Sequence, residues 1–486
     1  MKPTSCATLI RSAFAYVPTS SQNEVINSLS LFLDEAPPHS IYILRGYAGT
    51  GKSSLLGAVV KALRQQRRMY RLLAPTGRAA KVLQNYCQAP AQTIHKEIYR
   101  QQNQDPQAEE AFKVGNNRDR RGTVYIVDEA SMISNQSEGF NPFGSGQLLD
   151  DLLEYCMGVR DAQVVFVGDD AQLPPVSSEY SPAMDPNYLA QYGYPLYQGA
   201  LLDVVRQEAS GEIVGLSVKL RALLQEMQSN GGVWQAPLLP TPTGQEVHVI
   251  SGYDFPSTLE SSYRKVGREE TLVITRSNRE AEQLNREIRF RSLFYEEPIA
   301  RGEYLMVCRN NYLHIPFDET DRPTSAFIAN GEVLKVLHCS APHERYGFHF
   351  CKAELQDPDG GYVSAQLLLD TLNSGVASLT SEQRQALYQA VMTSYTDVNN
   401  KRKLFKALRE DPYLNALQVK YACAMTCHKS QGGQWRHVYI SLPFLRPEVV
   451  DEQFIRWLYT AMTRATEKLY FISPPNLLFS SAEESF

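Results

Sequence analysis

The chain has 486 residues, of which 43% are apolar and 21% charged, a composition typical of folded globular proteins rather than disordered ones. This length predicts roughly three domains, and the absence of any run of about 18 apolar residues excludes a helix that spans a bilayer. The net charge of −5 excludes a whole-molecule field that attracts nucleic acid, so any such site must be a local basic groove.

The first chemical motif is a glycine-rich loop between a predicted strand at 41–45 and a predicted helix that follows Ser53. The loop, GYAGTGKS, can turn its backbone N–H groups around a phosphate because it carries three glycines, Gly46, Gly49 and Gly51. Lys52 would reach the β- and γ-phosphate oxygens, and Ser53 would offer a hydroxyl to Mg²⁺. The sequence therefore predicts nucleotide binding. We interpret the basic run at 61–71 as a solvated helix face.

A polar stretch at 97–122 interrupts the alternation of short strands and helical patterns in the first 200 or so residues. That alternation predicts one doubly wound α/β domain. The polar stretch itself predicts a projecting hairpin or loop, with Tyr99 and Phe112 as apolar candidates for its tip or its base. A disordered linker is the alternative.

Two further predicted strands end in polar residues suited to nucleotide hydrolysis. The strand at 123–127 runs into Asp128 and Glu129, and in an open parallel sheet the ligand lies at the carboxyl ends of the strands. Asp128 would hold Mg²⁺ through water, and Glu129 would be the general base for the attacking water. The strand at 163–167 leads into GDDAQLPPV, where Gln172 could sense the γ-phosphate. Taken alone, these residues also fit a solvated acidic loop and an ordinary turn.

The second half of the chain predicts another α/β domain that is interrupted by an insertion. Buried-strand patterns occur within 271–278, at 437–441 and at 468–473. Residues 296–417 instead alternate like the strands of a β-barrel and include a helical pattern near their end.

Two features late in the chain are ambiguous. Cys423, Cys427 and His428 form the only cluster of metal-ligand types among eight scattered cysteines, but they are too few for a closed zinc site, so we expect free thiols. LYTAMTRAT at 458–466 predicts a small-residue helix that carries Arg464, and the spacing alone fits a surface arginine.

Taken in order, these motifs resemble those of the superfamily 1B helicases of the RecD-like and Dda-like group. The first half has likenesses to the Q motif and motifs I, Ia, Ib, II and III, at 18–22, 46–53, 72–83, 93–96, 127–134 and 168–176. The second half has likenesses to motifs IV, V and VI, at 201–207, 426–434 and 458–466. The resemblance covers almost the whole chain, and its order is more specific than any single motif.

The resemblance implies an ATP and Mg²⁺ site between two domains. It implies that Gln22 reads the adenine edge and that Arg206 and Arg464 approach the γ-phosphate from the second domain. Lys52, Glu129 and Gln172 keep the roles given above, and Ser53 and Asp128 hold Mg²⁺. The remaining implied nucleotide contacts are Gly46, Gly49, Thr50, Gly51 and Gly432. Tyr47 stands where the family more often has a small residue, which could alter nucleotide access.

The resemblance also implies a groove that grips DNA phosphates without reading sequence. In the first domain it implies contacts by Pro75, Thr76, Arg78, Thr93, His95 and Lys96. In the second domain it implies contacts by His428, Lys429 and Ser430. Helix capping by Thr76 and Thr93, and a plain surface charge for Lys96, are the alternatives.

The implied fold is α/β, with two RecA-like P-loop motor domains at 1–203 and at 204–295 with 418–486. Residues 97–122 would form an inserted pin subdomain, and 296–417 an inserted SH3-like β-barrel with a helical extension. The implied function is that of an ATP-dependent helicase that moves 5′ to 3′ on single-stranded DNA as a monomer and unwinds duplexes with a single-stranded tail. Two alternatives stay open: an ATP-gated translocase or clamp that does not unwind, and a P-loop kinase or metabolic ATPase. The first residues lack a secretory signal, so we expect an unprocessed cytoplasmic protein with no membrane partner.

Overall fold

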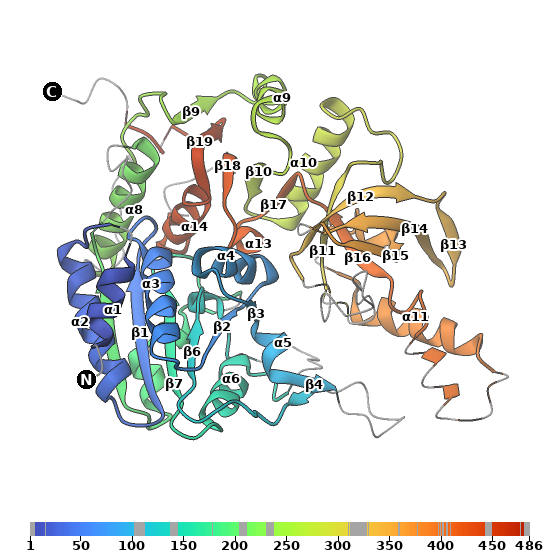
Figure 1. The fold of residues 1–486 in the computed structure, drawn as a ribbon. Coiled ribbons are helices and arrows are strands. Elements are labelled where there is room, and N and C mark those ends of the chain that lie inside the picture. Colours follow the sequence, from blue (N-terminus) through green and yellow to red (C-terminus); the bar gives the residue numbers. More distant parts are fainter. Residues whose placement is uncertain are drawn as a thin grey trace.

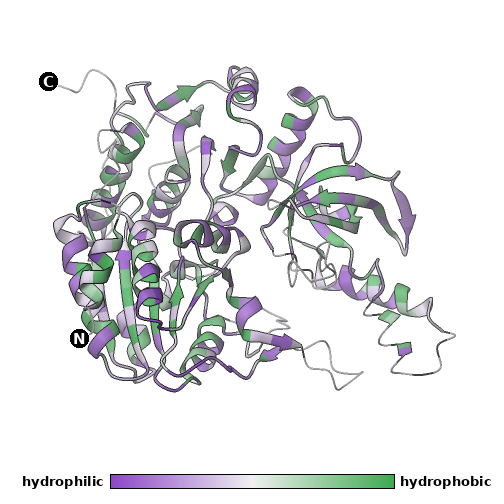
Figure 2. Ribbon diagram, in the orientation of Figure 1, coloured by the Kyte–Doolittle hydropathy of each residue, from purple (hydrophilic) through white to green (hydrophobic). Residues whose placement is uncertain are grey.

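The computed structural model describes the chain except for residues 1–4, 15, 102–111, 137–143, 177, 204–210, 230–237, 310, 312–327, 329, 358–359, 377, 397, 399, 401–402, 405–406, 409, 443–449, 477 and 481–486. The described residues form two α/β units that lie against each other and a β-barrel beside them (Figure 1). Apolar strands run through the middle of each unit (Figure 2). Within these ranges, no helix is long and apolar enough to cross a membrane.

The first unit, the first α/β domain, is built on a sheet whose six described strands are all parallel, in the order β3-β2-β6-β7-β1-β8. These are β1 (Ser40–Gly46), β2 (Tyr70–Ala74), β3 (Ala91–Thr93), β6 (Val124–Val127), β7 (Gln163–Gly168) and β8 (Leu196–Leu201). The predicted strands at 41–45, 123–127 and 163–167 are therefore confirmed.

Helices cover both faces of this first sheet. One face packs on α1 (Cys6–Ala13), α2 (Ser20–Glu35), α3 (Lys52–Gln65) and α4 (Gly77–Cys87). The other packs on α5 (Ile94–Ile98), α6 (Leu148–Met157) and α7 (Pro186–Ala190). Along β1, Tyr42 and Leu44 join the first core whereas Ile41 and Ile43 join the second, because successive side chains point to opposite faces. A strand buried on both sides reads as a continuous apolar run, and for that reason these strands could be predicted.

The second α/β domain has five described parallel strands in the order β17-β10-β18-β19-β9. These are β9 (Val247–Ile250), β10 (Thr271–Thr275), β17 (Ala424–Thr426), β18 (Trp435–Ser441) and β19 (Ala465–Ile472). One face packs on α8 (Glu212–Ser229) and α14 (Glu452–Met462), and the other on α9 (Phe255–Val266) and α10 (Asn278–Arg291). The short helix α13 (Cys427–Ser430) follows β17. All the strand patterns predicted for this domain are confirmed.

The insertion in the second domain forms a closed ring of strands. In the described residues, neighbouring strands pair in the order β12-β11-β16-β15-β14. A further pairing between β12 and β14 closes the ring. The strands are β11 (Tyr304–Val307), β12 (Val333–Cys339), β13 (His343–Arg345), β14 (Phe348–Gln356), β15 (Tyr362–Leu368) and β16 (Leu417–Tyr421). Because β16 pairs with β11 and β15, the predicted boundary at residue 417 is wrong and the barrel extends to Tyr421. The predicted helix is α11 (Ser381–Thr393), which begins with a capping box between Thr380 and Gln383.

The polar stretch in the first domain begins and ends as an antiparallel hairpin. Strand β4 (Tyr99–Gln101) pairs with β5 (Phe112–Val114), and the residues between them lie outside the described ranges. Tyr99 is buried and its hydroxyl donates to Asp151 Oδ2 at 2.6 Å, so it belongs to the base of the hairpin. The side chain of Phe112 lies outside the described residues.

Two local predictions were wrong, the second only in part. Arg464 does not lie on a helix, because α14 ends at Met462 and β19 begins at Ala465. The backbone carbonyl of Arg464 accepts a bond from Trp435 N at 2.9 Å, so the chain has already joined the sheet. The prediction of a solvated helix face at 61–71 holds for the exposed Lys61 and Arg64 of α3, but it is wrong beyond Gln65, where that helix ends, and β2 begins at Tyr70. Within that run, the partly buried Arg68 donates to Leu33 O and to Gln163 Oε1.

Candidate nucleotide and nucleic-acid sites

The phosphate loop connects β1 to α3. Gly49 and Gly51 have φ of 79° and 88°, in the left-handed region where a side chain would be strained. Lys52 Nζ donates to the carbonyls of Gly46 and Tyr47, the latter at 3.0 Å, and lies 4.0 Å from Asp169 Oδ2. A Cβ on Gly46 would lie 2.9 Å from Lys52 Cγ, so a larger residue there would displace the lysine. The ammonium group of Lys52 is therefore bonded to carbonyls of its own loop, and a phosphate bound in the loop would compete with those carbonyls for it.

Asp128 and Glu129 follow β6 at the same edge of the sheet. Asp128 Oδ1 accepts the Glu129 backbone N–H at 2.9 Å, and Glu129 adopts a φ of 51°, which is uncommon for a residue with a side chain. Burial, followed by the neighbouring Glu129 carboxylate, raises the pKa of Asp128 to about 7. Glu129 Oε2 is buried without a hydrogen-bond partner among the described residues. Such an orphaned acceptor beside a second carboxylate fits a cation with oxygen ligands, and the Ser53 hydroxyl at the start of α3 is of the same ligand type.

The loop after β7 contributes a third set of polar groups. Asp169 is fully buried, and its Oδ1 accepts the Ala171 N–H at 3.1 Å. Gln172 Nε2 donates to Asp169 Oδ2 at 3.5 Å, whereas Gln172 Oε1 and the nearby Ser131 Oγ are buried and have no partner in the described residues. We call Asp128, Glu129, Ser131, Asp169 and Gln172 the sheet-edge cluster. A site for a polar ligand is expected to contain buried polar atoms that have no partner until the ligand binds, and the unpartnered atoms of this cluster fit that expectation.

A tyrosine of the second domain bridges two loops of the first domain. Tyr459, on α14, accepts the Ala48 N–H of the phosphate loop at 3.0 Å and donates its own proton to Asp169 Oδ2 at 2.8 Å. Burial, followed by Asp169, raises the pKa of Tyr459 well above its usual value, so the hydroxyl keeps that proton. The next residue, Thr460, accepts the Leu173 N–H at 2.8 Å. Sequence reasoning missed Tyr459, although it lies in the same motif as Arg464.

Gln22 lies directly against the phosphate loop. It is only 1% exposed, its Nε2 donates to Thr50 O at 3.0 Å, and its Oε1 accepts the Thr19 N–H at 3.0 Å as part of the capping box of α2. In this structure its amide therefore supports the loop, and its contact with adenine stays a prediction.

Of the three second-domain residues expected at the nucleotide, the structure describes Arg464 and Gly432. Arg464 is 4% exposed and donates to Thr460 O, Gly433 O and Thr463 Oγ1, all within its own domain. A Cβ on Gly432 would lie 2.8 Å from the Cβ of Ala79, so this glycine permits close packing on α4 rather than on the phosphate loop. Arg206 lies outside the described residues. The nucleotide roles of all three stay predictions.

In the first domain, the expected DNA-contact residues lie after β2 and β3, with Pro75 half-buried. Thr76 caps α4 by accepting the Ala79 N–H, and Thr93 caps α5 by accepting the Lys96 N–H, so the capping alternative is realised for both. Burial lowers the pKa of Lys96, and it lowers that of His95 to about 4, which makes His95 neutral at pH 7. Neutral His95 can offer a phosphate a hydrogen bond but no charge.

At the contact between the domains, the expected DNA residues are less accessible. The Arg78 guanidinium stacks on Trp435 at 3.7 Å from the ring centroid and donates to Gln434 O at 3.1 Å. Ser430 is fully buried and its hydroxyl donates to Cys427 O at 2.8 Å, so the expected contact of its side chain with DNA does not fit this conformation. His428 and Lys429 are half-buried, and burial lowers the pKa of His428. Cys423 and Cys427 are free thiols, the first half-buried and the second buried.

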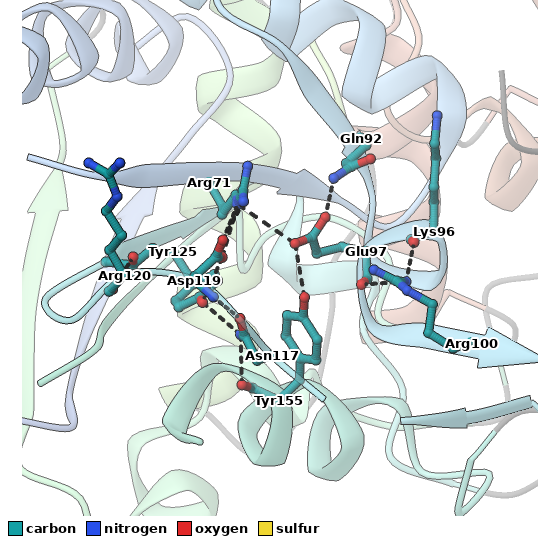
Figure 3. Close-up of polar contacts among 11 residues, drawn as sticks. Arg71, Gln92, Lys96, Glu97, Arg100, Asn117, Asp119, Arg120, Tyr125 and Tyr155 are labelled. Carbon is teal, nitrogen blue, oxygen red and sulfur yellow. Dashed lines mark hydrogen bonds and ion pairs between the residues drawn. The ribbon is translucent and has the colours of Figure 1, made fainter. Parts of the chain in front are cut away.

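A network of paired charges holds the hairpin base to the sheet (Figure 3). Arg71 of β2 forms a bidentate pair with Asp119 and lies 3.7 Å from Glu97 Oε1. Tyr155 donates to Glu97 at 3.1 Å and Tyr125 donates to Asp119 at 3.0 Å. Burial would raise the pKa of Asp119, but the bonds from Arg71 and Tyr125 outweigh it and lower that pKa. We call these five residues the pin-base cluster.

Comparisons with known proteins agree with the motif order. The model of an AAA domain matches residues 35–221, and that of a UvrD-like helicase C-terminal domain matches residues 421–472. The ATP-dependent RecD2 DNA helicase of Deinococcus radiodurans is 30% identical over 162 residues, which are 33% of this chain and 20% of that protein. An uncharacterised protein of Acanthamoeba polyphaga mimivirus is 22% identical over 516 residues, covering 93% of this chain and 99% of that one.

Among solved structures, the chain is similar to Pif1 helicase from Candida albicans and to Pif1 helicase from Bacteroides in complex with ADP-AlF3 and single-stranded DNA. Each has 15% identity and a TM-score of 0.46, and the likeness covers 96% of this chain with 97% and 95% of those chains. The two family models match the two α/β domains in the order of the motifs. Together with the RecD2 helicase, they support the assignment of the chain to the superfamily 1B helicases.

Proposed function

We propose that the chain is an ATP-dependent DNA helicase that acts as a monomer, moves 5′ to 3′ along single-stranded DNA and unwinds the duplex ahead of it. The observation that carries this proposal is the position of Tyr459. One hydroxyl of the second domain bonds both the phosphate loop, at Ala48, and the loop that contains Gln172, through Asp169. A movement of either loop when the nucleotide is hydrolysed would change the hydrogen bonds of Tyr459. Such a contact can couple hydrolysis to movement of the second domain.

The hydrolytic step is assigned to the sheet-edge cluster and the phosphate loop. Lys52 would hold the β- and γ-phosphates, and Ser53 and Asp128 would hold Mg²⁺, which would neutralise charge on those phosphates. Glu129 takes the proton of the attacking water through its unpartnered Oε2. Gln172 responds to the γ-phosphate, and the charge that develops in the transition state is met by Arg206 and Arg464 once the domains close.

The DNA track is assigned to the residues at the starts of α4 and α5 and on α13. The hydroxyls of Thr76 and Thr93 accept bonds from their helices and keep their protons for phosphate oxygens. Lys96 and Lys429 supply positive charge, and none of these groups reads a base, which suits an enzyme that meets a new sequence at every step. The hairpin of β4 and β5 is assigned the role of the pin, and the ring of strands that of the SH3-like barrel.

The test is ATP turnover with and without single-stranded DNA, followed by strand separation on duplexes that carry a 5′ or a 3′ tail. We expect DNA to stimulate ATP turnover by the wild type, which should unwind only the duplexes with a 5′ tail. The Lys52→Ala variant should show neither DNA-stimulated turnover nor unwinding. Turnover that is indifferent to DNA would reject the helicase in favour of a kinase or metabolic ATPase. DNA stimulation without strand separation would favour the translocase or clamp, and unwinding from 3′ tails alone would reject the direction.

A further inference from the structure

A cation of the second domain lies directly against the phosphate loop. The guanidinium carbon of Arg221, on α8, lies 4.2 Å from the centroid of the Tyr47 ring. One turn further along the same helix face, Gln225 Nε2 donates to the Tyr47 hydroxyl at 3.4 Å. Tyr47 and Ala48 also pack against the hydrophobic core of the second domain. The tyrosine that departs from the family pattern is thus the point where α8 meets the phosphate loop.

Arg221 is unusual because a nitrogen of its buried guanidinium has no acceptor among the described residues. The residue is 8% exposed, and the unpartnered atom is its Nε. Arg289, which is also 8% exposed, shows the ordinary solution. It pairs with Glu303 and donates to the carbonyls of Glu297 and Pro298. Both guanidinium groups stack on a tyrosine, Arg289 at 4.1 Å from the Tyr421 ring, so stacking does not account for the difference.

Among the described residues, this buried guanidinium stacks on a ring but has no hydrogen-bonding anion at its Nε to compensate its charge. Its surroundings indicate which anion is missing. The carbonyl of Tyr47, whose ring carries Arg221, accepts the bond from Lys52 Nζ at 3.0 Å. Two cations from different domains therefore converge on one residue of a phosphate loop. The planar guanidinium matches phosphate oxygens in charge and geometry.

We propose that Arg221 is an additional nucleotide-binding residue, supplied by the second domain, that contacts the polyphosphate of ATP. It rests on the Tyr47 ring in the conformation seen here and moves from the ring to phosphate oxygens as the domains close on the nucleotide. Tyr47 is the resting place that keeps this cation beside the loop. This proposal rests on the proposed function, because it assigns Arg221 to the same ATP site.

The test compares single substitutions in the full chain by the KM for ATP in saturating single-stranded DNA and by the affinity for a fluorescent ADP analogue. Arg221→Gln should raise the KM about tenfold or more and lower the affinity for the ADP analogue, because a charged group that pairs with phosphate is removed. Arg221→Lys, which keeps the charge but not the fork, should lie between it and the wild type. Lys219→Gln removes the same charge from an exposed position on the same helix and should match the wild type.

Tyr47→Leu separates a nucleotide role from a structural one. It removes the ring but keeps a bulky side chain, so Arg221 loses its resting place and the KM should fall about two- to fivefold, the reverse of Arg221→Gln. If the stack served only to join the domains, both substitutions would raise the KM, and the proposal would be overturned. A wild-type KM and analogue affinity in Arg221→Gln would overturn it as well.

The two proposals fail in different ways. The analogue affinity does not depend on turnover or DNA, so it tests Arg221 even if the wild type proves not to be a helicase. Loss of DNA-stimulated turnover in the wild type would reject the proposed function alone. Unfolding midpoints of the Arg221 variants within the range of the Lys219→Gln control would show that an altered affinity does not reflect misfolding.

Discussion

Two groups of carboxylates in the first domain differ in whether the protein supplies their hydrogen-bond partners. In the pin-base cluster, Glu97 and Asp119 each accept bonds from Arg71 or tyrosine hydroxyls, so that their charges are compensated. In the sheet-edge cluster, Glu129 Oε2 has no partner in the described part of the chain, and Glu129 has a positive φ. The first arrangement holds the chain together, whereas the second leaves polar groups available to a ligand at a cost in stability.

Two buried arginines of the second domain also differ in the partners that the protein supplies for them. Arg289 has a carboxylate and two carbonyls, and Arg221 has a tyrosine ring beside the phosphate loop. Sorting buried charges by whether the protein itself satisfies them therefore distinguishes structural groups from groups that serve a ligand. The predictions below test this distinction.

The largest effect is expected from Lys52→Ala. Nothing else in the phosphate loop can place a charge on the β- and γ-phosphates, so ATP turnover should fall by about three orders of magnitude. The unfolding midpoint should change little, because the hydrogen bonds of the lysine go to carbonyls of its own loop and its ion pair with Asp169 is long, at 4.0 Å. Turnover measured at saturating ATP and DNA checks this, and turnover within tenfold of the wild type would contradict the assignment.

Breaking the pin-base cluster should affect stability. Arg71→Gln leaves the buried Glu97 and Asp119 without a cation, and because Arg71 itself is 40% exposed we expect a loss of about 2 to 3 kcal/mol in unfolding free energy. The matched control is Arg121→Gln, which breaks an exposed pair with Asp161 and should have little effect. Urea unfolding followed by circular dichroism compares the two. Equal effects would show that burial does not decide the strength of these pairs.

Acid should destabilise the first domain through His95. Its pKa is lowered to about 4 by burial, with Asp151 acting in the opposite direction, while the unfolded chain keeps the usual value of about 6.5. The unfolded state therefore gains a proton first as pH falls, so between pH 7 and pH 5 the fold should lose about 2 kcal/mol through this residue. His95→Asn should flatten the pH dependence of the urea midpoint over that range. An unchanged slope would show that His95 titrates normally in the fold.

The smallest effect is expected from removing an orphaned hydroxyl. Ser131 and Ser262 are both 1% exposed, but Ser131 Oγ has no partner in the described chain, whereas Ser262 Oγ bonds to Tyr439 and His437. Ser131→Ala should change the unfolding free energy by less than about 0.5 kcal/mol, while Ser262→Ala should cost about 1 to 3 kcal/mol. Similar losses in the two variants would mean that Ser131 has a structural partner after all.

The sequence predicted what local pattern determines. The central strands of both sheets could be recognised because burial on two faces makes them continuously apolar, and the phosphate loop because its glycines and lysine have fixed spacing. The edge strands β8 and β9 are only partly buried and were not predicted. The end of α14 was missed because the chain turns from helix to strand within two residues, Thr463 and Arg464, which carry no turn signal.

Contacts between the domains could not be predicted in the same way. Tyr459 lies 411 residues from Ala48, and Arg221 lies on a different helix from any recognised motif. No spacing in the sequence records that these side chains meet the phosphate loop. The unusual Tyr47 was the one local sign that this loop has a partner of its own.

The central claim is that the sheet-edge cluster hydrolyses ATP, with Glu129 as the general base. The most direct measurement is single-turnover hydrolysis by Glu129→Gln with single-stranded DNA, beside the affinity for a fluorescent ATP analogue. The claim predicts binding within a few-fold of the wild type and hydrolysis slowed by about 10² to 10⁴. Hydrolysis at the wild-type rate with nucleotide bound would contradict it.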